Sequence, residues 1–152
     1  MIKKLFAPGK DSTATSIGLL ALRLFFGLTM LLHHGLDKLE HFSQMAPHWA
    51  DPLGIGHKAS LGLTVFSEVV AAILLAFGLL TRFAALVLAI EMAVAFVTIH
   101  KLTLGGAVPG EFAFVYFGAY LTLLFAGGGK FSMDKPLFGK GGSSKGGFSQ
   151  PK

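Results

Sequence analysis

The chain has 152 residues, of which 53% are hydrophobic and 14% are charged, and its mean hydropathy is +0.65. Because soluble domains usually carry about 25% charged residues, this composition excludes an ordinary soluble domain and predicts one membrane-embedded domain. The absence of cysteine excludes disulfides, thiolate metal ligands and iron–sulfur clusters, and the formal charge of +5 lies mainly near the two ends, which argues against a nucleic-acid partner.

Four continuous apolar runs follow one another along the chain. Since about 20 apolar residues cross the hydrocarbon core of a bilayer, we interpret each run as a membrane-spanning helix. The expected helices cover residues 15–36, 59–80, 83–100 and 111–126. Thr81 and Arg82 form a very short turn before the third run, and Pro109 and Gly110 mark a break before the fourth. The predicted fold class is therefore an all-α membrane protein with a bundle of four transmembrane helices.

The positions of the lysine and arginine residues predict the orientation of the bundle, because cytoplasmic segments are enriched in both. Nine lie in the two terminal flanks and the turn at Arg82, and three lie in the opposite loops, at Lys38, Lys58 and Lys101. Both termini are therefore expected in the cytoplasm. The expected organisation is an N-terminal segment over 1–14, a four-helix domain over 15–135 and a flexible tail, rich in Gly, Ser and Lys, over 136–152.

Three charged residues, Arg23, Glu68 and Glu91, interrupt the apolar runs. A charge at the bilayer centre costs about 2.5–3.5 kcal/mol on insertion scales, so we expect these side chains to be paired or used inside the bundle. One reading is a structural clamp between Arg23 and a glutamate. Because one arginine cannot neutralise two carboxylates, the other reading is that one carboxyl group is protonated and takes part in proton transfer.

Helical periodicity places further polar residues on shared faces. The first helix carries a stripe of polar and small side chains, formed by Arg23, Gly27, His34 and Lys38. His100 and Glu111 flank one loop and could meet the outer end of that helix, although capping of the fourth helix is an alternative role for Glu111. Glu91 lies nine residues before His100 and therefore points away from it, so the two are not expected to serve one site.

A metal site is a weaker hypothesis. His33, Asp37 and His41 are spaced four residues apart, and such spacing aligns ligands on one helical face. The alternative is that these side chains are solvated at the membrane surface. No HExxH pattern is present, so we assign no metal site.

Two longer segments of the sequence resemble motifs of a known protein family. The segments ALRLFFGLTMLLHHGLDK (residues 21–38) and SEVVAAILLAFGLLTRFAAL (residues 67–86) resemble two motifs of the DoxX family of small membrane proteins. The interval from His100 to Glu111 and the ending AGGGKFSMD (residues 126–134) fit the same family, so the resemblance covers residues 21–134. It implies a four-helix protein of the bacterial cytoplasmic membrane.

The resemblance also implies roles for particular residues. The family is named after a subunit of a thiosulfate:quinone oxidoreductase, so quinone is the implied cofactor. The candidate polar cleft or quinone site comprises Arg23, His34, Lys38, Glu68, His100 and Glu111. The expected structural positions of the family pattern are Gly27, Gly35, Gly78, Thr81 and Arg82. We expect an Arg23–Glu68 pair at the base of an outward-facing cleft, and Glu91 lies outside the pattern.

Three functions remain open at this point. The first is a quinone-interacting or accessory subunit of a membrane redox system, and the second is a non-catalytic scaffold or assembly factor. The third is a small proton-coupled transporter. Whether the chain turns over a substrate on its own stays open. The expected partners are membrane lipid, a soluble or membrane redox protein and further copies of the chain.

Overall fold

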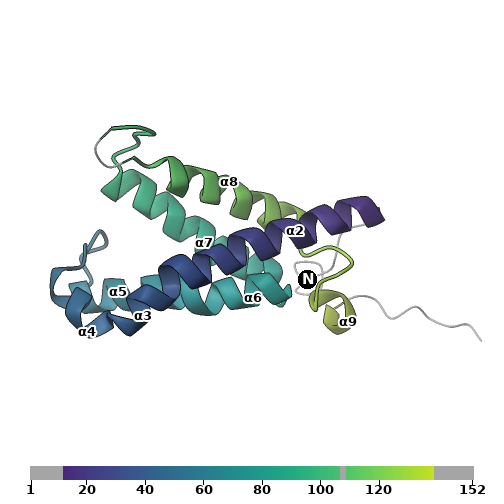
Figure 1. The fold of residues 1–152 in the computed structure, drawn as a ribbon, viewed down its shortest axis with the longest axis horizontal. Coiled ribbons are helices and arrows are strands. Elements are labelled where there is room, and N and C mark those ends of the chain that lie inside the picture. Colours follow the sequence, from purple (N-terminus) through teal and green to yellow (C-terminus); the bar gives the residue numbers. More distant parts are fainter. Residues whose placement is uncertain (1–11, 107–108, 139–152) are drawn as a thin grey trace, which may run out of the picture.

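In the computed structural model, which describes residues 12–106 and 109–138, all elements of the described chain are helices (Figure 1). The first long helix consists of α2 (Thr13–Met30), η1 (Leu31–Gly35) and α3 (Leu36–Glu40). The second consists of α5 (His57–Val65), η3 (Phe66–Ala71) and α6 (Ala72–Phe77). The third consists of α7 (Thr81–Val94) and η4 (Ala95–Ile99), and the fourth is α8 (Glu111–Ala126). Short elements are α4 (Phe42–Met45), η2 (Ala46–His48) and α9 (Asp134–Phe138).

Three of these helices are long and apolar enough to cross a membrane: Thr13–Glu40, His57–Phe77 and Thr81–Ile99. The fourth, α8, is apolar but has only 16 residues. The expected helical, membrane-compatible architecture is therefore confirmed, although the first helix runs four residues further than expected. The second helix begins at His57, two residues earlier than expected.

Small side chains allow the helices to pack closely. The buried core includes Ala72, Ala84 and Ala85, each fully inaccessible. A Cβ atom at Gly27 would lie 3.1 Å from the carbonyl oxygen of Ala72, so this glycine permits the contact of α2 with α6. Such small-residue contacts are typical of helices that associate within lipid.

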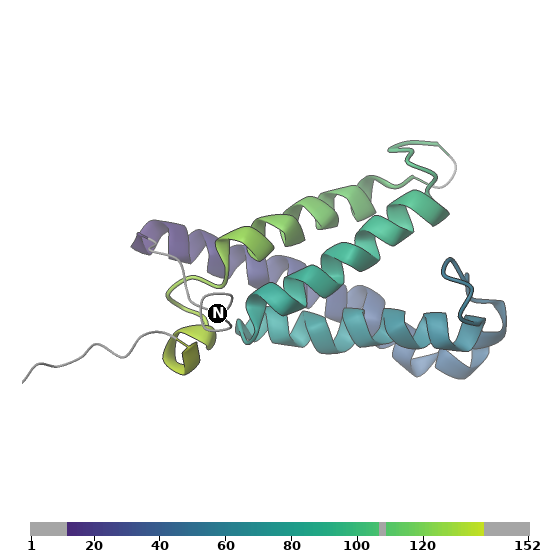
Figure 2. The ribbon, with the colours of Figure 1, turned by 180° about the vertical axis from the view of Figure 1, so that it is seen from behind.

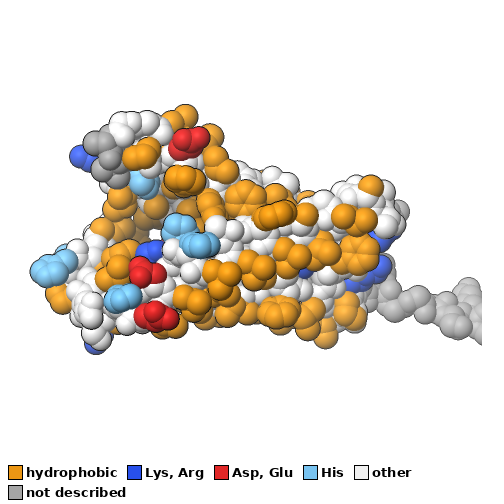
Figure 3. Space-filling model, viewed as in Figure 1, with side chains coloured by type: hydrophobic (Ala, Val, Ile, Leu, Met, Phe, Trp, Pro, Cys, Tyr) orange, Lys and Arg blue, Asp and Glu red, His pale blue; other side chains and the backbone are white. Residues whose placement is uncertain are grey.

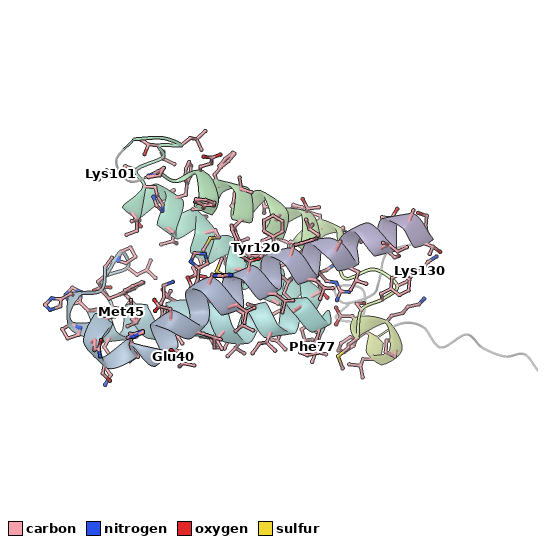
Figure 4. The ribbon with its side chains drawn as sticks, viewed as in Figure 1. Glu40, Met45, Phe77, Lys101, Tyr120 and Lys130 are labelled. Atoms are coloured by element: carbon pink, nitrogen blue, oxygen red, sulfur yellow. The ribbon has the colours of Figure 1, made fainter. Side chains whose placement is uncertain are left out.

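Tyr120 lies in the middle of the bundle (Figure 4). It is fully buried, its hydroxyl donates a hydrogen bond of 3.3 Å to the carbonyl of Phe26, and its ring packs edge-on against the Phe26 ring. In contrast, large apolar side chains are exposed on the bundle, among them Phe25 and Phe125, each more than 70% exposed. An apolar exterior around a core of small residues suits a lipid environment.

The two ends of the bundle differ. At one end α7 and α8 pack together and diverge from the helices α3, α4 and α5, which leaves the bundle open (Figures 1 and 2). At the other end the chain turns after α8 and folds back towards α9, beside the turn between α6 and α7. We call these the open end and the clasp end, and we call residues 127–134 the clasp. Figure 4 places Lys101 and Met45 at the open end, and Phe77 and Lys130 at the clasp end.

Three π-helical segments belong to three different long helices: η1 and η3 lie inside the first and second, and η4 ends the third. In a π-helical turn the hydrogen bonds run from i to i+5, so each segment widens the helix and shifts the side chains that follow it. The segments η1 and η3 also touch closely, because a Cβ atom at Gly35 would lie 2.6 Å from the carbonyl oxygen of Glu68. Such segments occur frequently at functional sites.

Candidate functional site

The open end contains a cavity of about 660 Å³. Figure 3 shows the hollow between the two diverging pairs of helices, with basic, acidic and histidine side chains around it. Most of its lining is apolar or aromatic, including Trp49, Phe66, Ile90, Phe112 and Tyr116. All three π-helical segments contribute to this lining, and they carry His34, Ser67 and Glu68 into it.

Lys38 and Glu68 form an ion pair in this cavity. The Nζ atom of Lys38, on α3, donates to both carboxylate oxygens of Glu68, on η3, at 2.6 and 2.9 Å. The two side chains retain only 15% and 5% of their exposure. The same ammonium lies 5.8 Å from the centre of the Trp49 ring, within range of a cation–π contact. The pair therefore joins the first two long helices at the cavity wall.

Glu91 reaches the same cavity from α7. Its carboxyl group interacts with Ser67 and Glu68, and its Oε2 atom is buried with no hydrogen-bond partner among the described residues. The expectation that Glu91 and His100 face opposite directions is wrong, because both line this cavity. The segment η4 lies between them and changes the helical periodicity on which that expectation depended.

His34 and Tyr116 also belong to the polar part of the lining. Their rings are 6.2 Å apart between centroids and nearly perpendicular, at 81°. Of the six residues expected to form the polar cleft, His34, Lys38, Glu68 and His100 therefore line one cavity. Glu111 is exposed in the first turn of α8 and is not part of the lining.

Arg23 lies elsewhere, and the expected Arg23–Glu68 pair is wrong. Arg23 is completely buried, its Nη2 atom donates a hydrogen bond of 3.0 Å to the carbonyl of Phe131 in the clasp, and it does not line the cavity. Helical side chains lean towards the N-terminus of their helix. Arg23 therefore leans towards the clasp end, whereas Lys38, fifteen residues later, leans back towards Glu68.

The clasp contains the carboxylate that accompanies Arg23. Asp134 attracts the guanidinium electrostatically and accepts hydrogen bonds from the backbone amides of Leu80, at 2.6 Å, and Thr81, at 2.9 Å. Asp134 thus caps the N-terminus of α7, where a negative charge is favourable. Sequence reasoning included the segment 126–134 in the family pattern but assigned no role to this aspartate.

The residues expected to be structural in the family pattern lie at close contacts. Gly78 has a φ of +70° and adjoins Arg23 so closely that a Cβ atom there would overlap the guanidinium. Thr81 is fully buried, and the Nη2 atom of Arg82 donates to the carbonyl of Phe125 at 3.1 Å. The expected turn at Thr81 and Arg82 is wrong, because both belong to α7 and the turn lies at residues 78–80. This turn and the start of α7 are therefore tied both to the first helix and to α8.

The weak metal candidates do not form a centre. His41 Nδ1 lies 3.1 Å from an oxygen of Asp37, both side chains are exposed, and His33 is exposed as well. Within residues 12–106 and 109–138, no group of three or more histidine, aspartate or glutamate side chains is arranged to hold a metal ion.

Comparisons with known proteins bear on this arrangement. The model of the family described as DoxX matches residues 18–101, which is more than half of the chain and includes most of the cavity lining. A protein of Haemophilus influenzae described as uncharacterized is 38% identical over 78 residues, which is 48% of this chain and 58% of that protein. The chain thus spans a little over half the length of this relative. No solved structure matches the chain significantly.

Proposed function

The chain belongs to the DoxX family, and on that basis we propose that it is a multi-pass protein of the bacterial cytoplasmic membrane that binds a quinone in its open-end cavity. In this role it serves as a quinone-interacting or accessory subunit of a membrane redox system. A soluble or membrane redox protein would supply the electrons. Lipid would surround the bundle, and the proposed protein neighbours include further copies of the chain.

One observation carries the proposal: a mostly apolar, aromatic-lined cavity of about 660 Å³ also has polar side chains in its wall. A quinone combines an apolar ring and tail with two carbonyl groups, so it needs this combination of surfaces. Ligand pockets of a few hundred Å³ typically pair apolar walls with a few well-placed polar groups. Lys38, His34 and Tyr116 carry groups that can donate hydrogen bonds to a carbonyl.

For the membrane topology we propose four spans, in which the short α8 is extended by the residues that flank it. Sixteen residues rise only about 24 Å, against a hydrocarbon core of about 30 Å. The start of α2 lies beside the clasp, because Lys130 Nζ is 3.4 Å from the Thr13 hydroxyl. The lysine-rich flanks of both ends then fall on one side, which we propose is the cytoplasm. The proposed organisation keeps the segments 1–14, 15–135 and 136–152, although residues 1–11 and 139–152 lie outside the described part.

A scaffold or assembly role is the second candidate, and the clasp favours it. Arg23 is buried against a backbone carbonyl and Asp134, which is the environment of a structural charge rather than of a reactive one. If this role holds, Arg23→Leu should change the stability of the protein or the set of proteins that co-purify with it. Quinone binding would then be absent from the wild-type chain.

The test of quinone binding uses a pair of adjacent histidines. The purified chain in lipid nanodiscs is titrated with decylubiquinone, and quinone carried through purification is extracted and quantified. His34→Ala removes a side chain from the cavity, whereas His33→Ala removes an exposed neighbour that does not line it. We expect saturable binding that His34→Ala weakens about five- to tenfold, as for one lost hydrogen bond, and that His33→Ala leaves unchanged. Absence of saturable binding in the wild type would overturn the proposal.

A further inference from the structure

The ionisable side chains of the cavity leave one carboxyl group without a counter-charge. Lys38 supplies one positive charge and is engaged with both oxygens of Glu68. Glu91 lies close enough to interact with Glu68 and Lys38, yet no ion pair joins it to a basic side chain among the described residues. A second carboxylate beside the first is unfavourable, because like charges at short range disfavour the ionised form.

The surroundings of Glu91 strengthen this argument. Its Oε2 atom is buried and lacks a hydrogen-bond partner among the described residues, while apolar side chains such as Ile90 and Met92 form the adjoining wall. An isolated ionised carboxylate in such surroundings is very costly, whereas a neutral carboxylic acid is much less so. A neutral acid also has a hydrogen to donate, and Glu91 is one of the residues that line the cavity.

We propose that Glu91 is held as a neutral carboxylic acid and donates its hydrogen to a carbonyl oxygen of the ligand in the cavity. The identity of that ligand rests on the proposed function, but the neutral state of Glu91 does not. The proposal makes the cavity selective for neutral, carbonyl-bearing apolar molecules. It disfavours lipophilic amines, which would require an ionised Glu91.

Several titratable side chains lie around the Glu91 carboxyl group. Lys38 on α3, Glu68 on η3, His34 on η1, His100 on η4 and Tyr116 on α8 line the same cavity. Tyr120 on α8 also interacts electrostatically with Glu91. The competing arrangement is an ionised Glu91 whose charge is balanced by a protonated His34 or His100. The two arrangements differ in whether the protein contains a buried protonated carboxyl group, which is directly measurable.

The first arm of the test needs no ligand. Infrared spectra of the full chain in nanodiscs at pH 7 are compared between the wild type and Glu91→Gln. We expect the difference spectrum to contain the C=O band of a protonated carboxylic acid, shifted in heavy water. Glu111→Gln, at an exposed position, should give no such band. A carboxylate band in place of the acid band would overturn the proposal. Glu91→Asp, in which the acid band should persist at a shifted position, repeats the test if Glu91→Gln fails to fold.

The second arm measures the affinity for decylubiquinone. Glu91→Gln keeps a hydrogen-bond donor of similar size without the acid, so we expect an affinity within about twofold of the wild type. Glu91→Leu removes the donor and should weaken binding about tenfold. Loss of binding in Glu91→Gln, or no loss in Glu91→Leu, would overturn the donor role. If the wild type binds no quinone, the proposed function fails, and the infrared arm still decides the state of Glu91.

Discussion

Lys38 is the partner of Glu68: its ammonium lies 2.6 Å from one carboxylate oxygen and 2.9 Å from the other, across the contact between α3 and η3. The pair lies beside the close contact between η1 and η3 at Gly35. Both side chains are largely buried. Removing the charge of either one should therefore change the stability of the open end.

The first prediction concerns the two halves of this pair. Lys38→Met and Glu68→Gln should each lower the free energy of unfolding by about 3–5 kcal/mol, because each leaves a buried partner uncompensated. The double variant should lose much less than the sum of the two, since no charge is then left alone. Unfolding of each variant in detergent micelles measures the effect. Additive losses in the double variant would show that the pair is not coupled.

The second prediction concerns Gly78 at the clasp end. Its φ of +70° alone makes alanine unfavourable by about 1–2 kcal/mol, and a Cβ atom would also overlap the Arg23 guanidinium. Gly78→Ala should therefore lower the unfolding midpoint markedly. Gly118→Ala is the matched control, because this helical glycine has open space around its Cβ position and should become slightly more stable. Similar midpoints for the two variants would contradict the arrangement of Arg23.

The third prediction concerns the capping role of Asp134. Asp134→Ala removes the acceptor of the Leu80 and Thr81 amides and also the carboxylate beside the buried Arg23. It should therefore lower the free energy of unfolding by at least about 2 kcal/mol. Asp134→Asn retains an acceptor and should lose less. The exposed Asp37 provides a control, and Asp37→Ala should change stability by less than about 1 kcal/mol. Equal losses in the free energy of unfolding for Asp134→Ala and Asp37→Ala would contradict the capping role of Asp134.

The fourth prediction concerns the loop that covers the cavity beside Trp49. The Ser60 hydroxyl and the backbone amides of Gly56 and Ile55 donate to Asp51, and these hydrogen bonds lower the pKa of its carboxyl group. Since the folded-state pKa lies below the unfolded value of about 3.9, Asp51 stabilises the loop above that pH. This stabilisation is lost as the pH falls through the folded-state pKa.

Fluorescence of Trp49, the chain's single tryptophan, reports on this loop. The change in wild-type emission that depends on Asp51 should appear below about pH 4. Asp51→Asn should already show altered emission at neutral pH and a flatter acid response. An acid transition identical in both proteins would assign it to another group.

The apolar runs were sufficient to predict the helices, because a membrane-embedded helix must be apolar over most of its length. The resemblance to the family, together with helical periodicity, grouped His34, Lys38, Glu68 and His100, and these four line one cavity. The pairing of Arg23 could not be predicted, since it depends on a backbone carbonyl in the clasp, more than 100 residues later. Because every residue has a backbone carbonyl, the residue types do not indicate which carbonyl will accept a hydrogen bond.

The position of Glu91 was missed for a different reason. A helical wheel assumes one constant periodicity, but two of the long helices contain an internal π-helical segment and a third ends in one. No residue type marks these segments in the sequence, and each one changes which later side chains face inward. The same segments bring the polar side chains together. The helical-wheel prediction was therefore wrong for residues that line the candidate site.

The most direct test of the central claim is whether a quinone occupies the cavity beside Trp49. Decylubiquinone should quench Trp49 emission saturably in nanodiscs, because the indole lines the cavity. Ala95→Phe, which fills the cavity from η4, should weaken this quenching at least about tenfold. Val97→Phe, on the exposed side of the same segment, should leave it unchanged. Equal quenching in both variants, rising linearly with the quinone content of the lipid, would contradict a quinone site in this cavity.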